Sequence, residues 1–226
     1  MVSDGQIIKH FLAVKMNEQK WLVAAAGEWP DSAVWQPLVE AAERIIAVDG
    51  GVAELASNKV EAAVVIGDLD SADSVAIARH PMARIIEVSE QGNSDLVKAL
   101  NWCDENGASV VDVIGVGGGR TDHVLGTFAA MLEVPTSLEV KLHFGDCTAT
   151  LLKPVAIIEA KKGQQVSIFA LGGDIEDLDM RGFEYEVESE RISFSTRGLH
   201  NRATVDNPEI SFSENSPGRL LVMIFY

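Results

Sequence analysis

The sequence predicts two domains of different class: an N-terminal α/β domain with a largely parallel sheet flanked by helices, followed by a C-terminal antiparallel β-sandwich. Up to about residue 132, continuous apolar runs alternate with segments of helical period. After Pro135 the runs become short and rich in β-branched and aromatic residues. The 226 residues are enough for two small domains. We expect an N-terminal extension over residues 1–20, an α/β domain over 21–135 and a sandwich over 136–226.

Five apolar runs predict the strands of the first domain. They are continuous rather than alternating, which is typical of parallel strands covered on both faces. The runs are residues 21–26, 44–48, 62–66, 83–88 and 109–114.

Two helices are predicted among these strands. In SDLVKALNWCDENG, Leu96, Leu100 and Cys103 recur at helical spacing, with Ser94 as the expected N-cap and Gly107 as the expected stop. A second helix is expected in TDHVLGTFAAML, and its apolar positions are Val124 or Leu125, Phe128 and Leu132.

Eight short segments predict the strands of the sandwich. Clusters of Gly, Asn, Asp and Pro separate them, as turns do in antiparallel domains. The segments are 140–144, 148–152, 155–159, 165–170, 183–187, 192–196, 209–212 and 219–226.

Composition excludes several classes of partner. The formal net charge of −16 argues against binding to nucleic acid or to an anionic membrane surface, because both need clustered Lys and Arg. Two cysteines, Cys103 and Cys147, are too few for a disulfide framework, which favours a reducing compartment. The start MVSDGQIIKH does not resemble a signal peptide, and no apolar run is long enough to span a bilayer. We therefore expect a cytoplasmic protein.

Carboxylates follow four successive predicted strands. Asp49 follows the second, Asp68 and Asp70 the third, Asp95 the fourth and Asp122 the fifth. In an open parallel sheet, ligands bind beyond the carboxyl ends of the strands. Each Asp alone could be a turn former or a helix cap, but several carboxylates on one edge repel unless a cation holds them. Oxygen ligands without Cys or His favour Mg²⁺, which usually accompanies phosphate.

The loop GVGGGR, residues 115–120, supplies the opposite charge. Glycines allow backbone N–H groups to approach an anion, a helix is expected directly afterwards, and Arg120 can fork onto phosphate oxygens. The loop matches neither a Walker loop nor a dinucleotide fingerprint. The alternative is a tight strand-to-helix turn, which would not require Arg120 and Asp122 beside it.

The motifs AVDGG, VIGDLDSAD, EQGNSDLVKAL, GGRTDH and GLHNRATV, in this order, resemble the thiamine pyrophosphokinase (thiamine diphosphokinase) family. The resemblance covers roughly residues 21–226. It implies a homodimer that binds thiamine between the α/β domain of one subunit and the sandwich of the other. It also implies that pyrophosphate is transferred from ATP to the thiamine hydroxyl with Mg²⁺, and that AMP is released.

The resemblance also assigns site residues. The catalytic residues it implies are Asp68, Asp70, Asp95, Arg120 and Asp122, of which the first three are metal ligands. The nucleotide-binding residues it implies are Asp49, Gly50, Gly51, Gly118, Gly119, Thr121 and His123, and those on the thiamine side are Gln91, His200 and Asn201. Two positions depart from the family pattern. The sequence has Gly-Asn-Ser-Asp at 92–95 where the family often has Asp-x-Thr-Asp, and His200 where it commonly has Ser.

Several alternatives stay open from the sequence. Either Asp70 or Asp95 could accept the hydroxyl proton. His123 could be a first-turn residue with only local hydrogen bonds. The same machinery could serve another hydroxymethyl heterocycle such as a pterin. A phosphatase with an aspartyl nucleophile, or a non-catalytic thiamine or nucleotide sensor, would be a different class of protein.

Overall fold

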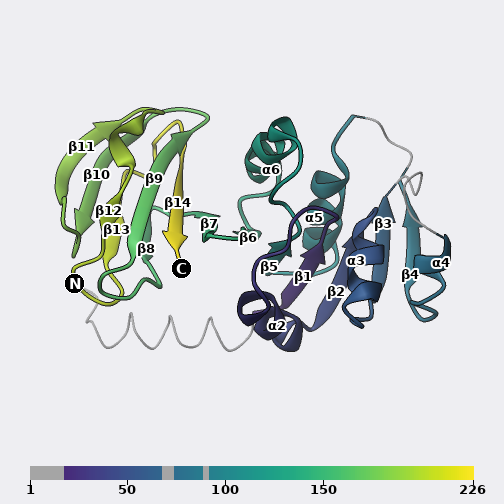
Figure 1. The fold of residues 1–226 in the computed structure, drawn as a ribbon. Coiled ribbons are helices and arrows are strands. Elements are labelled where there is room, and N and C mark those ends of the chain that lie inside the picture. Colours follow the sequence, from purple (N-terminus) through teal and green to yellow (C-terminus); the bar gives the residue numbers. More distant parts are fainter. Residues whose placement is uncertain (1–17, 68–73, 89–91) are drawn as a thin grey trace. The chain divides into compact units, whose positions relative to one another are not determined.

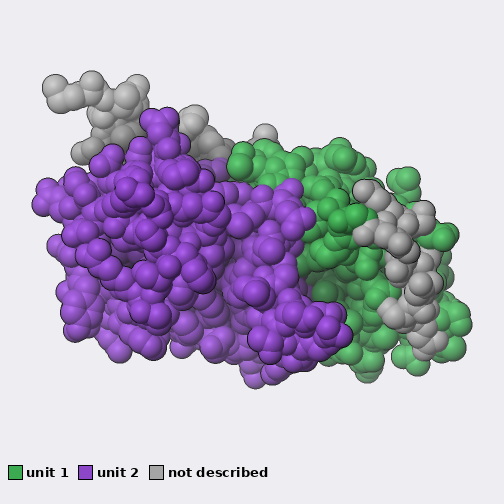
Figure 2. All heavy atoms as spheres, turned by 90° about the horizontal axis from the view of Figure 1, so that it is seen from above, with its two compact units in different colours: residues 1–26, 36–112, 134–139 green, residues 27–35, 113–133, 140–226 purple. Residues whose placement is uncertain are grey.

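The computed structural model describes residues 18–67, 74–88 and 92–226, which form two compact units, coloured separately in Figure 2. Unit 1 takes its described residues from 1–26, 36–112 and 134–139, and unit 2 consists of 27–35, 113–133 and 140–226. No helix within the described ranges is long and apolar enough to cross a bilayer.

Unit 1 is built on a parallel sheet (Figure 1). Strands β1 (Lys20–Ala24), β2 (Arg44–Val48), β3 (Val64–Gly67) and β4 (Arg84–Glu87) pair in this order, all parallel. Strand β3 is buried along its whole length, so both faces of the sheet are covered at its centre. A fifth strand, β5 (Val110–Ile114), follows in the chain. These five strands confirm the prediction made from the five apolar runs of the sequence.

Helices separate the strands, as predicted for an α/β domain. They are α2 (Ser32–Ala41), α3 (Gly51–Ser57), α4 (Ser74–Ile77) and α5 (Asp95–Glu105). Helix α3 packs on β1 and β2, and α5 packs on β1, β2 and β3.

The ends of α5 confirm the sequence prediction. The hydroxyl of Ser94 accepts a hydrogen bond from the amide of Val97 at 3.3 Å, which caps the helix. Leu100 and Cys103 are fully buried, and Gly107 adopts a positive φ of 99° just beyond the last turn.

Helix α6 (Thr121–Glu133) forms as expected, but the predicted buried face is partly wrong. Leu125 is 69% exposed and Leu132 is 37% exposed, whereas Thr127, Ala130 and Met131 are buried. Apolar residues occur nearly all round this helix, so periodicity alone does not select the face that packs.

Unit 2 contains the predicted sandwich. Its first sheet has the order β12 (Asn201–Arg202), β9 (Gln165–Leu171), β14 (Arg219–Phe225), β7 (Cys147–Leu151) and β6 (Glu139–His143). Its second sheet has the order β11 (Val187–Ile192), β10 (Ile175–Arg181), β13 (Glu209–Ser211) and β8 (Val155–Ile157). Neighbouring strands are antiparallel, and one apolar core joins Ile168 and Val222 of the first sheet to Leu178, Met180 and Ile210 of the second.

Two strands of the second sheet differ from the prediction. Strand β10 was not expected, and the expected segments 183–187 and 192–196 are replaced by the single strand β11 between them. The sequence IEDLDMR of β10 carries three acidic residues, a type depleted in strands. The pairing of β10 with β11 also changes register, and Asp177 has a φ of 52°, so the apolar side chains do not alternate regularly.

Candidate functional site

The end of β2 places Asp49 beside the end of β3. The amide of Asp49 donates to the carbonyl of Ile66 at 2.9 Å, and the backbone of Asp49 takes a left-handed φ of 47°, which Asp tolerates better than most residues. A Cβ on Gly51 would lie 2.1 Å from the carbonyl oxygen of Ala24, so only glycine lets α3 begin this close to β1. Close packing therefore explains the glycine at position 51, and Asp49 lies at the end of β2, at the sheet edge.

A chain of contacts links the ends of β3 and β4 to Asp95. The amide of Val88 donates to the carbonyl of Gly67 at 3.0 Å. The ammonium group of Lys98 donates to the carbonyl of Val88 at 3.4 Å and to Oδ1 of Asp95 at 3.0 Å. Asp95 therefore lies at the same edge of the parallel sheet as Asp49, as the sequence predicted.

Lys98 is a residue of this edge that the sequence analysis missed. Its side chain is only 9% exposed, although it sits in the first turn of α5, where the helix dipole disfavours a cation. The ion pair with Asp95 compensates for this position. The sequence could have indicated this ion pair, because Asp95 and Lys98 are three residues apart and such residues lie on one face of a helix.

Asp68, Asp70 and Gln91 lie outside the described residues, so their roles stay predictions. Gly67, directly before Asp68, ends β3 beside Asp49. Among the described residues, no three Asp, Glu, His or Cys side chains converge on one point as a metal site requires. The oxygen donors of the predicted set suit Mg²⁺ rather than Zn²⁺.

The glycine loop of unit 2 is held by the chain that follows β1. The amide of Gly27 donates to the carbonyl of Gly115, and that of Glu28 to the carbonyl of Gly117, both at 2.8 Å. Gly118 and Gly119 have φ values of 67° and 66°, which explains why glycine occupies these two positions. Helix α6 begins two residues later, so the loop ends at a helix N-terminus.

Arg120 and Asp122 form a forked ion pair in front of α6. Nε and Nη2 of Arg120 donate to the two carboxylate oxygens of Asp122 at 3.1 and 2.7 Å. This contact lowers the pKa of Asp122 below its ordinary value and raises that of Arg120. The two side chains are 74% and 62% exposed, so the pair orients the guanidinium in solvent rather than contributing to the core. The amide of His123 also donates to Asp122, at 3.1 Å.

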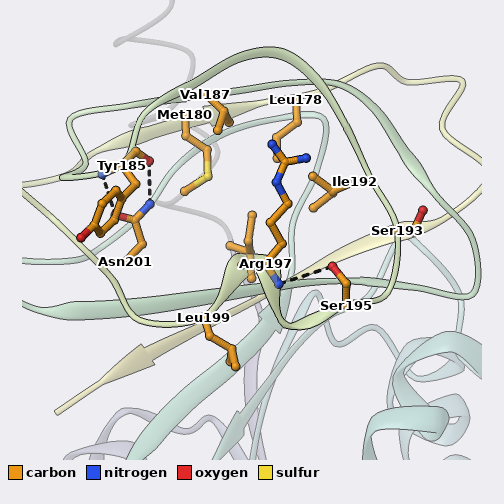
Figure 3. Close-up of a pocket in the computed structure, with 12 residues that line it drawn as sticks. Leu178, Met180, Tyr185, Val187, Ile192, Ser193, Ser195, Arg197, Leu199 and Asn201 are labelled. Atoms are coloured by element: carbon orange, nitrogen blue, oxygen red, sulfur yellow. Dashed lines mark hydrogen bonds between the residues drawn. The ribbon is translucent and has the colours of Figure 1, made fainter.

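The sandwich contains a small cavity of about 100 Å³, shown in Figure 3. Apolar side chains of β10 and β11 form one side, and Leu199, Asn201 and Arg197 come from the segment around β12. Tyr185 also lines the cavity, although the residue is 65% exposed. The sequence analysis missed Tyr185, whose signal was an aromatic residue between two charged ones in the segment FEYEV.

Asn201 and His200 are neighbours with different surroundings. Oδ1 of Asn201 accepts from the amides of Tyr185 and Arg202, and its Nδ2 donates to the carbonyl of Tyr185 at 2.8 Å (Figure 3). Asn201 thus fixes the backbone that carries Tyr185. His200 is not among the residues that line the cavity. Its imidazole lies against Gln165 of β9 instead, with 3.0 Å between Nδ1 and Nε2 of Gln165.

Within unit 1, the structure brings Asp49 and Asp95 to one edge of the sheet. Within unit 2, it brings Gly118, Gly119, Arg120, Thr121, Asp122 and His123 into one loop and helix start. It also places His200 and Asn201 in the strand region beside the cavity, with only Asn201 facing it.

Two family models match successive segments of the chain, and both describe domains of one kind of protein. Residues 35–142 match the model of the thiamin pyrophosphokinase catalytic domain, and residues 155–217 match that of its vitamin B1 binding domain. Thiamine pyrophosphokinase of Bacillus subtilis is 25% identical over 186 residues, which is 79% of this chain and 85% of that protein.

Solved structures show the same fold. The crystal structure of thiamine pyrophosphokinase from Bacillus subtilis has a TM-score of 0.78 at 22% identity and covers 91% of this chain and 98% of its own. Yeast thiamin pyrophosphokinase has a TM-score of 0.77 at 14% identity, covering 93% of this chain and 87% of its own. The two family models, the sequence relative and the shared fold lead to one conclusion: the chain belongs to the thiamine pyrophosphokinase family.

Proposed function

We propose that this chain transfers pyrophosphate from ATP to the hydroxyl of thiamine, giving thiamine diphosphate and AMP. Membership of the family supports the reaction class. The observation that carries the proposal for this chain is the set of contacts at the end of the parallel sheet. They bring Asp49, the end of β3 that leads into Asp68, and Asp95 to one edge.

The acidic residues are proposed to hold a magnesium ion. Asp68, Asp70 and Asp95 would be its ligands, because their carboxylate oxygens are the donors that Mg²⁺ prefers. The ion, when bound with ATP, would supply positive charge to the phosphates. Lys98 already holds Oδ1 of Asp95, so the other oxygen of this carboxylate is the one we assign to the ion.

The glycine loop and the start of α6 are proposed to hold the phosphates. The glycine loop leads into the N-terminus of α6, a position that favours an anion, and Arg120 offers a guanidinium that Asp122 keeps oriented. Phosphoryl transfer depends mainly on positioning and on charge neutralisation. Asp70 or Asp95 would accept the proton from the thiamine hydroxyl.

The sandwich is proposed to receive thiamine. The cavity and its lining residues lie within the segment that matches the vitamin B1 binding model. Ligand pockets usually measure about 300–1,000 Å³, so a cavity of about 100 Å³ would take only part of the molecule. The exposed ring of Tyr185 offers a face to a cationic heterocycle, and Asn201 holds that residue in place. Gln91 and His200 are the other proposed contacts.

We further propose that the enzyme is a homodimer in a reducing, cytoplasmic environment. Val155 and Ile157, two apart on the edge strand β8, are 80% and 52% exposed, and this apolar surface supports association. Both cysteines are free and buried, which agrees with a reducing compartment.

The products of one reaction test the proposal. With ATP, Mg²⁺ and thiamine, the protein should form thiamine diphosphate and AMP in equal amounts, without ADP or free phosphate. ADP would indicate transfer of a single phosphoryl group, and free phosphate without an acceptor would indicate a phosphatase. AMP that appears only when a hydroxymethyl pterin replaces thiamine would overturn the assignment of thiamine.

A further inference from the structure

The carboxylate of Glu28 lies against the glycine loop, residues 115–120. The amide of Glu28 donates to the carbonyl of Gly117 at 2.8 Å, and the two residues form an isolated antiparallel bridge. A Cβ on Gly118 would lie 2.8 Å from Oε2 of Glu28 and 3.0 Å from its Cβ. Besides allowing a positive φ, glycine at position 118 therefore leaves the space that the Glu28 side chain occupies.

The turn between β6 and β7 borders the same carboxylate. A Cβ on Gly145 in this turn would lie 4.0 Å from Oε1 of Glu28. The preceding residue, Phe144, stacks on Phe128 of α6 with 5.3 Å between the ring centroids. Its Cδ1 would lie 3.6 Å from a Cβ on Gly117. These contacts hold the turn beside the loop, so the Glu28 carboxylate has a glycine on each side.

The charged side chains at the loop do not favour a free polyanion. The guanidinium of Arg120 is already paired with the carboxylate of Asp122 rather than with Glu28. Together these three side chains carry one positive and two negative charges. A carboxylate repels a phosphate at short range, and a divalent cation on the phosphates reduces this repulsion. The loop therefore suits phosphates that arrive with a cation better than phosphates without one.

We infer that Glu28 is a specificity residue: its carboxylate disfavours free ATP at the glycine loop and thereby restricts the site to ATP complexed with a divalent cation. The inference rests on the proposed function, which assigns the phosphates to this loop. Glu28 acts by repelling the wrong form of the nucleotide, a common means of achieving specificity. It takes no part in the transfer itself.

Titration calorimetry on the intact protein, without thiamine, tests the inference without measuring turnover. ATP is added once with EDTA, as the free nucleotide, and once with excess Mg²⁺. Glu28→Gln keeps the size of the side chain and removes its charge, so free ATP should bind about tenfold more tightly than to the wild type. The affinity for the Mg²⁺ complex should change less than about twofold. The ratio of the two affinities is decisive, because a displaced loop would change both together.

Two further variants control this comparison. Glu133→Gln removes the same charge from an exposed residue at the last position of α6, about 18 Å along the helix from its first residue. It should leave the ratio of affinities at the wild-type value. Glu28→Asp keeps the charge on a shorter side chain, so its ratio should stay within about threefold of the wild type.

The outcomes separate this inference from the proposed function. If Glu28→Gln has the same ratio of affinities as Glu133→Gln, the inference fails, while formation of thiamine diphosphate by the wild type would still support the proposed function. If the ratio changes as expected but no thiamine diphosphate forms, the role of Glu28 stands and the proposed reaction fails. If none of the proteins binds ATP in either form, both the phosphate site and the inference fail.

Discussion

Three acidic residues that the sequence singled out have different local surroundings. The left-handed backbone positions Asp49, the ammonium group of Lys98 holds Asp95, and the guanidinium of Arg120 holds Asp122. The carboxylates of Asp95 and Asp122 are each held by an ion pair, whereas for Asp49 it is the backbone conformation that is set. The same residue type therefore serves in three distinct electrostatic surroundings.

Asp70→Asn should lower kcat by about a thousandfold, because a charge that organises the transferred phosphates is lost. The midpoint of thermal unfolding should change little, because Asp and Asn have nearly the same size and shape. Asp73→Asn in the same segment is the control, because we assign Asp73 no role in the site. Turnover of Asp70→Asn at the wild-type rate with ordinary Mg²⁺ would refute the metal assignment.

The two cysteines should react very slowly with iodoacetamide in the native protein. Burial raises the pKa of both Cys103 and Cys147 to about 12, so at pH 8 only about one thiol in 10,000 is ionised. Mass spectrometry should find no label after brief treatment and two labels per chain after denaturation. As pH rises from the ordinary thiol pKa of 9.0 towards 12, the unfolded chain loses these protons first, so the stabilisation from both thiols decreases. Rapid native labelling would contradict this burial.

The glycine loop depends on its close contact with the segment after β1. A Cβ on Gly27 would lie 2.5 Å from the carbonyl oxygen of Gly115 and 2.7 Å from that of Gly117, and both are backbone atoms. The loop must therefore move if Gly27 is replaced. The position of the loop before α6 is thus a property of two chain segments together, not of the sequence GVGGGR alone.

Gly27→Ala should raise the KM for ATP by at least about tenfold while the KM for thiamine changes little, since the displaced loop is the proposed phosphate site. Steady-state kinetics with each substrate varied would show this. Equal KM values for ATP in wild type and Gly27→Ala would argue against phosphate binding by this loop.

Gly126→Ala is the control for Gly27→Ala: it makes the same substitution at a glycine with open surroundings, and we expect it to stabilise the protein. Gly126 lies inside α6, and a Cβ there would meet nothing within 4 Å. Alanine in a helix interior is more favourable than glycine by about 0.5–1 kcal/mol, so the free energy of unfolding should increase by about this amount. Denaturant unfolding measures the change, and a decrease would contradict the open surroundings of Gly126.

The chain combines a parallel sheet with acidic residues at one edge and a β-sandwich that has its own apolar core. Its formal net charge of −16 argues against a sequence-independent grip on nucleic acid, but net charge does not locate a site. The apolar sequence RLLVMIFY, predicted as a strand, forms β14 over Arg219–Phe225, which pairs on one side with β7 and on the other with β9. Exposed apolar residues of unit 2 include Val155 and Ile157 on β8, and also Tyr185 and Phe194.

The protein should sediment as a dimer at its working concentration. Exposed side chains such as Val155, Ile157 and Phe194 would lose contact with water on association, which favours a closed twofold pair. Sedimentation velocity should give twice the mass of one chain, in the presence and absence of substrates. A fully active monomer would refute the dimer.

The sequence alone determined the fold class, most strands and the position of Asp49 and Asp95 at the ends of strands of the parallel sheet. Continuous apolar runs such as residues 62–66 are typical of strands buried on both faces of a parallel sheet, and the chain after each parallel strand then emerges at the same edge. The cap of α5 at Ser94 was equally predictable, because a cap is a local hydrogen bond.

Only the tertiary structure decided the features that depend on contacts between distant segments. Apolar residues occur nearly all round α6, so the packing of neighbouring elements decides which of its faces is buried. The sequence did not predict strand β10, because it contains acidic residues and because its register with β11 changes along its length. Likewise, Gln165 and His200 are 35 positions apart, and only the pairing of β9 with β12 brings them together, since local sequence carries no information about such contacts.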